Sequence, residues 1–94
     1  MVTSQDLYIP VSTIPRKLLE RNENRWSWTI SNTGAVTVYY LRGDRGANVA
    51  TTGTNIGIPI AAGATDGYDD LDAQEEVWVI AGSDTVVMLG ETTK

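Results

Sequence analysis

Apolar and polar residues alternate with a period of two along several short stretches, and the clearest stretch is residues 26–31. It places Trp26, Trp28 and Ile30 on one face of an extended strand and three hydroxyl side chains on the other. Leaving both Trp side chains in water would cost several kcal/mol, at roughly 25 cal/mol per Å² of apolar surface. The pattern therefore predicts a strand whose Trp face packs in the core, with an interface as the alternative.

A second alternating run, residues 36–41, follows a short turn segment. Its side chains Val36, Val38 and Tyr40 fall on one face. Gly34, in the turn, can adopt the positive φ angle that tight hairpin loops require. Together the two runs predict a β-hairpin with a loop of about three to five residues.

Later segments also predict strands. Residues 77–81 and 85–89 are apolar on both faces, which is typical of central strands. Residues 56–60 alternate around Pro59, which indicates an edge strand because proline cannot donate to a β-ladder. The remaining segments are interpreted as a long surface loop (42–55), a turn (61–67), a short acidic strand (68–71) and a frayed polar tail (90–94).

The first 21 residues carry mixed signals, because Pro10 and Pro15 interrupt any regular pattern. We predict that residues 1–21 form an N-terminal arm with a possible edge strand and reach onto a neighbouring subunit, and that residues 22–94 form the folded domain. Deleting residues 1–15 is then expected to leave a folded domain that no longer binds its partner. The candidate partner-interface residues are the apolar and basic side chains of this arm: Leu7, Tyr8, Ile9, Arg16, Lys17, Leu18 and Leu19.

Short strands spaced near ten residues apart, with turn signals between them, indicate an all-β fold. We expect a small antiparallel β-sandwich or a jelly-roll-like barrel with an extended N-terminal arm and almost no helix. A chain of 94 residues buries roughly 60 to 70% of its unfolded surface, so its core is modest. With no cysteine to form a disulfide, association into a homo-oligomer is the remaining common way to bury more surface.

The charge balance is acidic, with seven Lys and Arg residues against twelve Asp and Glu residues and a net charge of −5. This argues against a nucleic-acid partner, since such binding depends on neutralising phosphates with basic side chains. Most basic residues precede residue 46 and most acidic residues follow residue 65, which suits subunits that meet through opposite charges. Two ordinary solvated surfaces are the equal alternative. Residues 1–6 do not resemble a secretory signal and no apolar run approaches the ~20 residues that span a bilayer, so we expect no membrane partner and synthesis as a soluble protein in the cytoplasm.

Candidate chemistry is sparse. The chain has no His and no Cys, and it lacks the Gly-x-Ser-x-Gly nucleophile motif, so we predict no enzyme activity and no cofactor. The acidic cluster Asp66, Asp69, Asp70 and Asp72 lacks the spacing of an EF-hand calcium loop. A solvated acidic turn is favoured, with a calcium or inter-subunit site as the alternative.

Aromatic side chains offer a different functional class. Aromatic faces stack on sugar rings, so a carbohydrate-binding β-sandwich module is the alternative to a purely structural protein. Packing of the Trp residues in the core is favoured by the alternation in residues 26–31. The candidate platform residues are Trp26, Trp28, Trp78, Tyr39, Tyr40 and Tyr68.

The order of five short motifs resembles small virion proteins of tailed bacteriophages and of related prophage regions. The first motif, residues 22–25, has Glu23 where the family pattern has proline, and the last has Trp78 in place of tyrosine. Each motif is weak alone, but the five occur in the family's order across roughly residues 18–89. The motifs are Asn22-Glu23-Asn24-Arg25, Trp28-Thr29-Ile30-Ser31-Asn32, Val36-Thr37-Val38-Tyr39, Gly57-Ile58-Pro59-Ile60-Ala61-Ala62-Gly63 and Val77-Trp78-Val79-Ile80-Ala81-Gly82.

The resemblance implies a β-sandwich structural subunit of a virion, with no catalytic and no metal-binding residue. Within that class we predict a capsid decoration or cement protein that acts as a homo-oligomer, for which a trimer is one arrangement. The expected partner is the major capsid protein or another virion protein. A neck or tail component of the phage is the alternative within this class.

Overall fold

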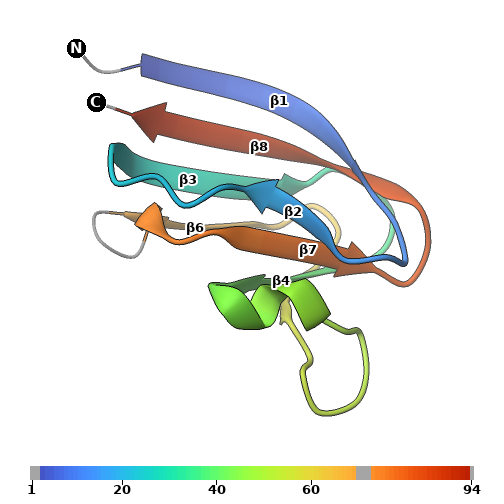
Figure 1. The fold of residues 1–94 in the computed structure, drawn as a ribbon. Coiled ribbons are helices and arrows are strands. Elements are labelled where there is room, and N and C mark those ends of the chain that lie inside the picture. Colours follow the sequence, from blue (N-terminus) through green and yellow to red (C-terminus); the bar gives the residue numbers. More distant parts are fainter. Residues whose placement is uncertain (1–2, 70–72, 94) are drawn as a thin grey trace.

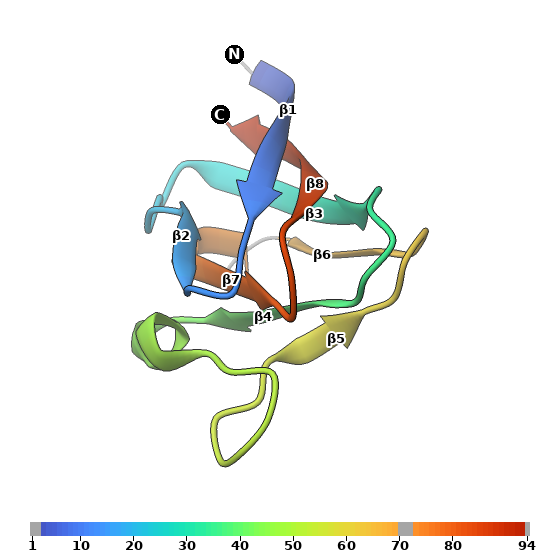
Figure 2. The same ribbon diagram turned by 90° about the vertical axis from the view of Figure 1, so that its right-hand side faces the viewer.

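The computed structural model describes residues 3–69 and 73–93, which form two four-stranded antiparallel sheets packed face to face (Figures 1 and 2). Sheet 1 contains, in spatial order, β1 (Thr3–Val11), β8 (Thr85–Thr93), β3 (Arg25–Asn32) and β6 (Thr65–Asp69). Sheet 2 contains β2 (Arg16–Leu19), β7 (Val77–Ala81), β4 (Val38–Arg42) and β5 (Ile58–Ile60). The predicted all-β sandwich is confirmed, and the described helical structure is limited to short 3₁₀ segments, among them η1 (Asp44–Asn48).

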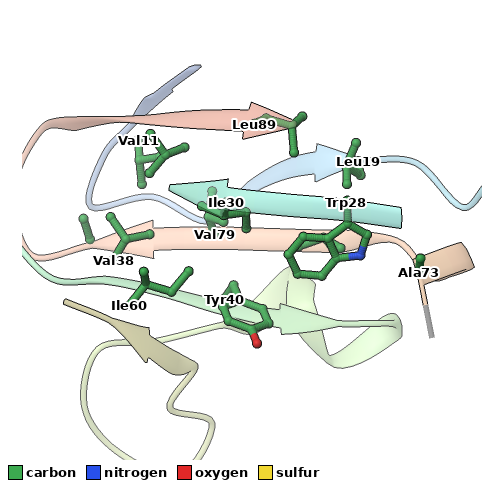
Figure 3. Packing of buried hydrophobic residues seen from close by; sticks show 13 residues of the cluster. Val11, Leu19, Trp28, Ile30, Val38, Tyr40, Ile60, Ala73, Val79 and Leu89 are labelled. Atoms are coloured by element: carbon green, nitrogen blue, oxygen red, sulfur yellow. The ribbon is translucent and has the colours of Figure 1, made fainter. Parts of the chain in front are cut away.

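The core lies between the two sheets and is built mainly from side chains that alternate along the strands and point inward (Figure 3). Trp28 and Ile30 of β3 are fully buried, as are Val38 and Tyr40 of β4, so the predicted inward positions of these four residues are confirmed. The rings of Trp28 and Tyr40 meet edge to face, with centroids 5.6 Å apart. Strands β7 and β8 lie in the middle of their sheets, as the apolar runs predicted. Other members of the core cluster are Val11, Leu19, Ile60, Ala73, Val77, Val79, Ala81, Val87 and Leu89.

The predicted hairpin between residues 26–31 and 36–41 is wrong, because these two runs lie in different sheets. β3 pairs with β6 and β8, whereas β4 pairs with β5 and β7. Asn32 holds the crossover between the sheets: its buried Nδ2 donates to the carbonyl oxygens of Val36 and Ile60, both at 2.8 Å. A period of two predicts which face of a strand is buried but contains no information about its neighbours in the sheet.

Residues 3–19 are part of both sheets rather than a separate arm. β1 pairs with β8 in register from Thr3–Thr93 to Val11–Thr85, and β2 pairs with β7. Val11 and Leu19 are buried in the core, so this segment contributes to the packing of the sandwich. The expected edge strand is present, but the structure differs from the expectation that residues 22–94 alone form the folded domain. Contact with a neighbouring subunit stays a prediction.

Two further expectations are wrong: that residues 42–55 form a surface loop and that residues 90–94 form a frayed tail. The segment 42–55 is not simply a surface loop, because η1 and Val49 cover the outer side of β4 and β7. Val49 packs there with Leu41 and Ile80 in a second small apolar cluster. The predicted frayed tail is instead the end of β8, which stays paired with β1 and β3 to Thr93, with a shift of register on the β3 side.

Candidate interaction surface

The outer face of sheet 1 carries an exposed apolar patch at its β1 edge. Tyr8 opposes Met88 and Pro10 opposes Val86 across the β1–β8 ladder. Opposed residues of an antiparallel pair project to the same face, and these four project away from the core. Tyr8 is 71% exposed and Val86 is 40% exposed. We call these four residues the β1–β8 patch.

The same sheet face is uncharged along its two central strands. The outward positions of β8 are Val86, Met88, Gly90 and Thr92, and those of β3 between Ser27 and Ser31 are hydroxyl residues. Charged residues make up 20% of the chain, so a charge-free face across two strands is a distinct feature. Charged groups are depleted from the centres of protein–protein interfaces, because their hydration must be removed on binding. This face therefore suits contact with another protein.

The structure divides the apolar candidate interface residues into exposed and packed ones. Leu7 and Tyr8 are exposed, with 48% and 71% of their surfaces accessible. Ile9 and Leu18 pack partly against the core, and Leu19 is buried in it. Of this set, Leu7 and Tyr8 are accessible enough to contact a partner extensively, and their role stays a prediction.

The basic candidates Arg16 and Lys17 have partners within the chain. Nη1 of Arg16 donates to the carbonyl oxygen of Pro10 at 3.1 Å. Nζ of Lys17 lies 3.3 Å from Oε2 of Glu76 and 5.3 Å from the ring centroid of Trp78. The hydrogen bond to Glu76 raises the pKa of the Lys17 ammonium above its usual value. Neither side chain projects as an isolated charge toward a neighbouring subunit.

Basic residues of the N-terminal part and acidic residues of the C-terminal part form ion pairs within the chain. Lys17 pairs with Glu76, and Arg21 pairs with Glu75, both at 3.3 Å. Arg25 pairs with Glu91 at 2.6 Å. At these positions, basic residues from the first part of the chain and acidic residues from the second part therefore join segments of one molecule rather than two subunits.

The acidic residues of β6 do not converge on one point. Asp66 projects inward, where its Oδ2 accepts a hydrogen bond from the Tyr40 hydroxyl at 2.6 Å. Asp69 lies three positions later and is exposed on the opposite face of the strand. Asp70 and Asp72 lie outside the described residues. Among residues 3–69 and 73–93, no group of three or more acidic side chains is arranged to hold a metal ion.

Most of the candidate sugar-platform aromatics form internal clusters. Tyr68 completes a group with Trp28 and Tyr40, with ring centroids 5.3 and 6.3 Å from them, and the Arg42 guanidinium lies 4.0 Å over its ring. Burial, and then the hydrogen bond to Asp66, raise the pKa of Tyr40. Tyr39 and Trp78 pack against the second apolar cluster. These residues therefore support the core interpretation rather than a shared platform.

Trp26 is the exception, because 45% of its surface is exposed. The pairing of β3 with β8 shifts between Arg25 and Ser27, so Trp26 is an extra residue in the ladder. The shift places Arg25 in the buried interior and turns the indole of Trp26 outward. The prediction that Trp26 shares the inner face with Trp28 is wrong for this reason. The exposed indole lines a shallow hollow of about 280 Å³ together with Ser27, Asp69 and Thr92.

No protein-family model matches this chain, and no curated protein matches it in sequence. Two solved structures are similar in fold. One is described as "Bacillus endospore appendages form a novel family of disulfide-linked pili"; it is 14% identical with a TM-score of 0.49, over 99% of this chain and 88% of that chain. The other, "Cyanophage Pam1 capsid asymmetric unit", is 11% identical with a TM-score of 0.44, over 97% of this chain and 82% of that chain. At these values neither similarity carries an argument about function.

The chain contains no cysteine. Within the described ranges, none of the helical structure is long and apolar enough to cross a membrane.

Proposed function

We propose that this chain is a non-enzymatic structural subunit of a phage-like virion, acting as a capsid decoration or cement protein. The observation that carries the proposal is the outer face of sheet 1, which is uncharged along the central strands β3 and β8 and carries the exposed β1–β8 patch. Such a surface favours contact with another protein, since it combines apolar area with little charge to desolvate. The five ordered motifs resemble small virion proteins of tailed phages, so we propose that the partner is another virion protein.

The strand order is consistent with this role. Sheet 1 has the order β1-β8-β3-β6 and sheet 2 has the order β2-β7-β4-β5. We infer from this order a jelly-roll topology, as if one long antiparallel ribbon with β4 and β5 at its turn were folded over on itself. Eight-stranded jelly rolls occur in viral capsid proteins and also in lectins, so the topology supports the proposal without deciding it.

The proposed partner is the major capsid protein, and the subunit acts mechanically. A sandwich that lies across the boundary between two capsid subunits adds buried interface to both, which opposes the outward pressure of packaged DNA. The β1–β8 patch faces the shell in this arrangement. The subunit is proposed to act as a homo-oligomer, for example a trimer at threefold positions of the shell.

Light scattering of the purified protein, alone and mixed with empty capsids of a candidate phage, tests the proposal. We expect an oligomer that saturates the shell at a fixed stoichiometry. The double variant Tyr8→Ser/Val86→Ser should weaken binding at least tenfold, since a loss of about 1.4 kcal/mol is already tenfold. A control is Ile56→Ser/Ile58→Ser, which changes two exposed apolar residues, 48% and 41% accessible, in β5 of the other sheet and just before it.

The control variant should bind as the unchanged protein does. A monomer that has no affinity for any shell would overturn the proposal. Equal binding by the β1–β8 patch variant and the unchanged protein would show that another surface faces the shell, and the part of the proposal that names the patch would be abandoned.

A further inference from the structure

We propose that the hollow beside Trp26 is a binding site for a neutral carbohydrate ring. This inference does not rest on the virion role, because it concerns a different end of the sheet face and a different ligand. It is carried by three features of the described residues: the outward indole, the polar groups beside it and the size of the hollow.

The indole of Trp26 is turned outward by the irregularity in the β3–β8 ladder. Arg25 opposes Thr93 and Ser27 opposes Thr92, so two steps along β3 correspond to one step along β8. A bulge of this kind re-aims a side chain, and bulges next to binding sites are commonly used for that purpose. Without the extra residue, regular alternation would place Trp26 on the inner face with Trp28. The fold thus presents a large aromatic face to solvent at one defined position.

Three polar side chains flank the indole in one row across sheet 1. Ser27 opposes Asp69 on β6 and Thr92 on β8, so the three residues lie side by side on the outer face. All three line the hollow together with Trp26. An aromatic face packs against the C–H face of a sugar ring, while a carboxylate and hydroxyls bond the ring hydroxyls. This combination of one apolar face and a few converging polar groups is what a carbohydrate ring requires.

The charge and volume of the hollow narrow the ligand class. Among the described residues, none that lines the hollow is basic, and Asp69 would repel a phosphate, sulfate or carboxylate placed beside it. A neutral, hydroxyl-rich ligand fits this electrostatic setting better than an anionic one. The volume of about 280 Å³ is near the lower end of known ligand pockets, about 300 Å³, which suits a single ring or the end of a chain.

Nuclear magnetic resonance of the ¹⁵N-labelled full chain tests the proposal directly. The three Trp residues give three indole N–H signals, and the variant Trp26→Ala assigns one of them. Glucose, galactose, mannose and N-acetylglucosamine, with short oligomers of each, are then titrated into the protein. We expect at least one neutral sugar to shift the Trp26 signal in a saturable way while the Trp28 and Trp78 signals stay unchanged.

Two variants and one control test the named contacts. Trp26→Ala and Asp69→Asn should each weaken binding of that sugar at least tenfold, and unchanged Trp28 and Trp78 signals show that the fold is intact. Binding to Trp26→Ala, which lacks the indole signal, is followed through the backbone amide signals of Ser27 and Thr92. Tyr8→Ala, which removes another exposed aromatic ring from the same sheet face, should bind the sugar as the unchanged protein does.

If no neutral sugar moves the Trp26 signal, or if Trp26→Ala binds equally well, the proposal is overturned. Binding of anionic sugars alone would overturn the assigned ligand class. Capsid binding, tested through Tyr8 and Val86, is a separate measurement, so each proposal can fail alone.

Discussion

Arg25 and Glu91 form an ion pair inside the sandwich, with Nε of Arg25 donating to Oε2 of Glu91 at 2.6 Å. Only 2% of the Arg25 side chain and 12% of the Glu91 side chain are exposed. The other guanidinium nitrogens donate to the backbone carbonyl oxygens of Glu20, Ala73 and Glu75. One side chain therefore joins the segment before β3, the segment before β7 and the end of β8.

Removing one member of this pair should strongly destabilise the protein. Glu91→Ala leaves the Arg25 charge buried without its carboxylate, and we expect the free energy of unfolding to fall by about 3–5 kcal/mol. Urea denaturation measures the change.

The exposed pair Arg21–Glu75 supplies the control, since Glu75→Ala should lower the free energy of unfolding by at most about 1 kcal/mol. The double variant Arg25→Met/Glu91→Leu should recover much of the loss, because it removes both charges together. Equal effects of Glu91→Ala and Glu75→Ala would contradict this account.

Two Trp residues separated by one position should respond very differently to truncation. Trp28 is 1% exposed between the sheets, so Trp28→Ala should lower the free energy of unfolding by about 3–5 kcal/mol. Trp26 is 45% exposed, and Trp26→Ala should change it by less than about 1 kcal/mol. Thermal unfolding followed by circular dichroism separates the two. A large loss in both variants would mean that Trp26 is a core residue and that the bulge is wrongly placed.

The inter-sheet hydrogen bond of Tyr40 predicts a loss of stability at high pH. The pKa of this phenol is raised above its ordinary value of 10.0, mainly by burial and then by its hydrogen bond to Asp66. The folded state therefore holds the proton more tightly than the unfolded state. This contribution to stability is complete below pH 10 and declines as the pH rises further. The free energy of unfolding, measured in urea at pH 8 and pH ~11, should fall less in Tyr40→Phe than in the unchanged protein. Equal declines would rule out Tyr40 as the responsible group.

Removal of β1 tests the corrected role of the N-terminal segment. β1 pairs with β8 along its whole length and buries Val11, so deleting residues 1–11 leaves β8 as an uncovered edge and opens the core. We expect the truncated chain to lose its cooperative unfolding transition, as measured by circular dichroism and by dispersion of amide proton resonances. A folded truncated domain would instead restore the idea of a dispensable arm.

Only part of the candidate surface could be predicted from the sequence. Tyr8 and Leu7 could be identified because they are apolar residues in a segment with edge-strand signals. Val86 and Met88 could not, since a run that is apolar on both faces gives no indication of which face stays exposed. The hollow at Trp26 depends on a bulge, which leaves no signal in the alternation of residues 26–31. The ion pairs between distant segments were also not predictable, because charge balance alone does not say which charges meet.

The sequence by itself determined that the protein is all-β, which residues of β3 and β4 face the core beyond the bulge, and that β7 and β8 are central strands. These features depend on local alternation and on apolar runs, and both are properties of neighbouring residues. Only the tertiary structure decided that β3 and β4 belong to different sheets, that residues 3–19 complete both sheets, and that Arg25 rather than Trp26 points inward. Strand pairing is a contact between residues far apart in sequence, and one extra residue in a ladder reverses the faces of those before it.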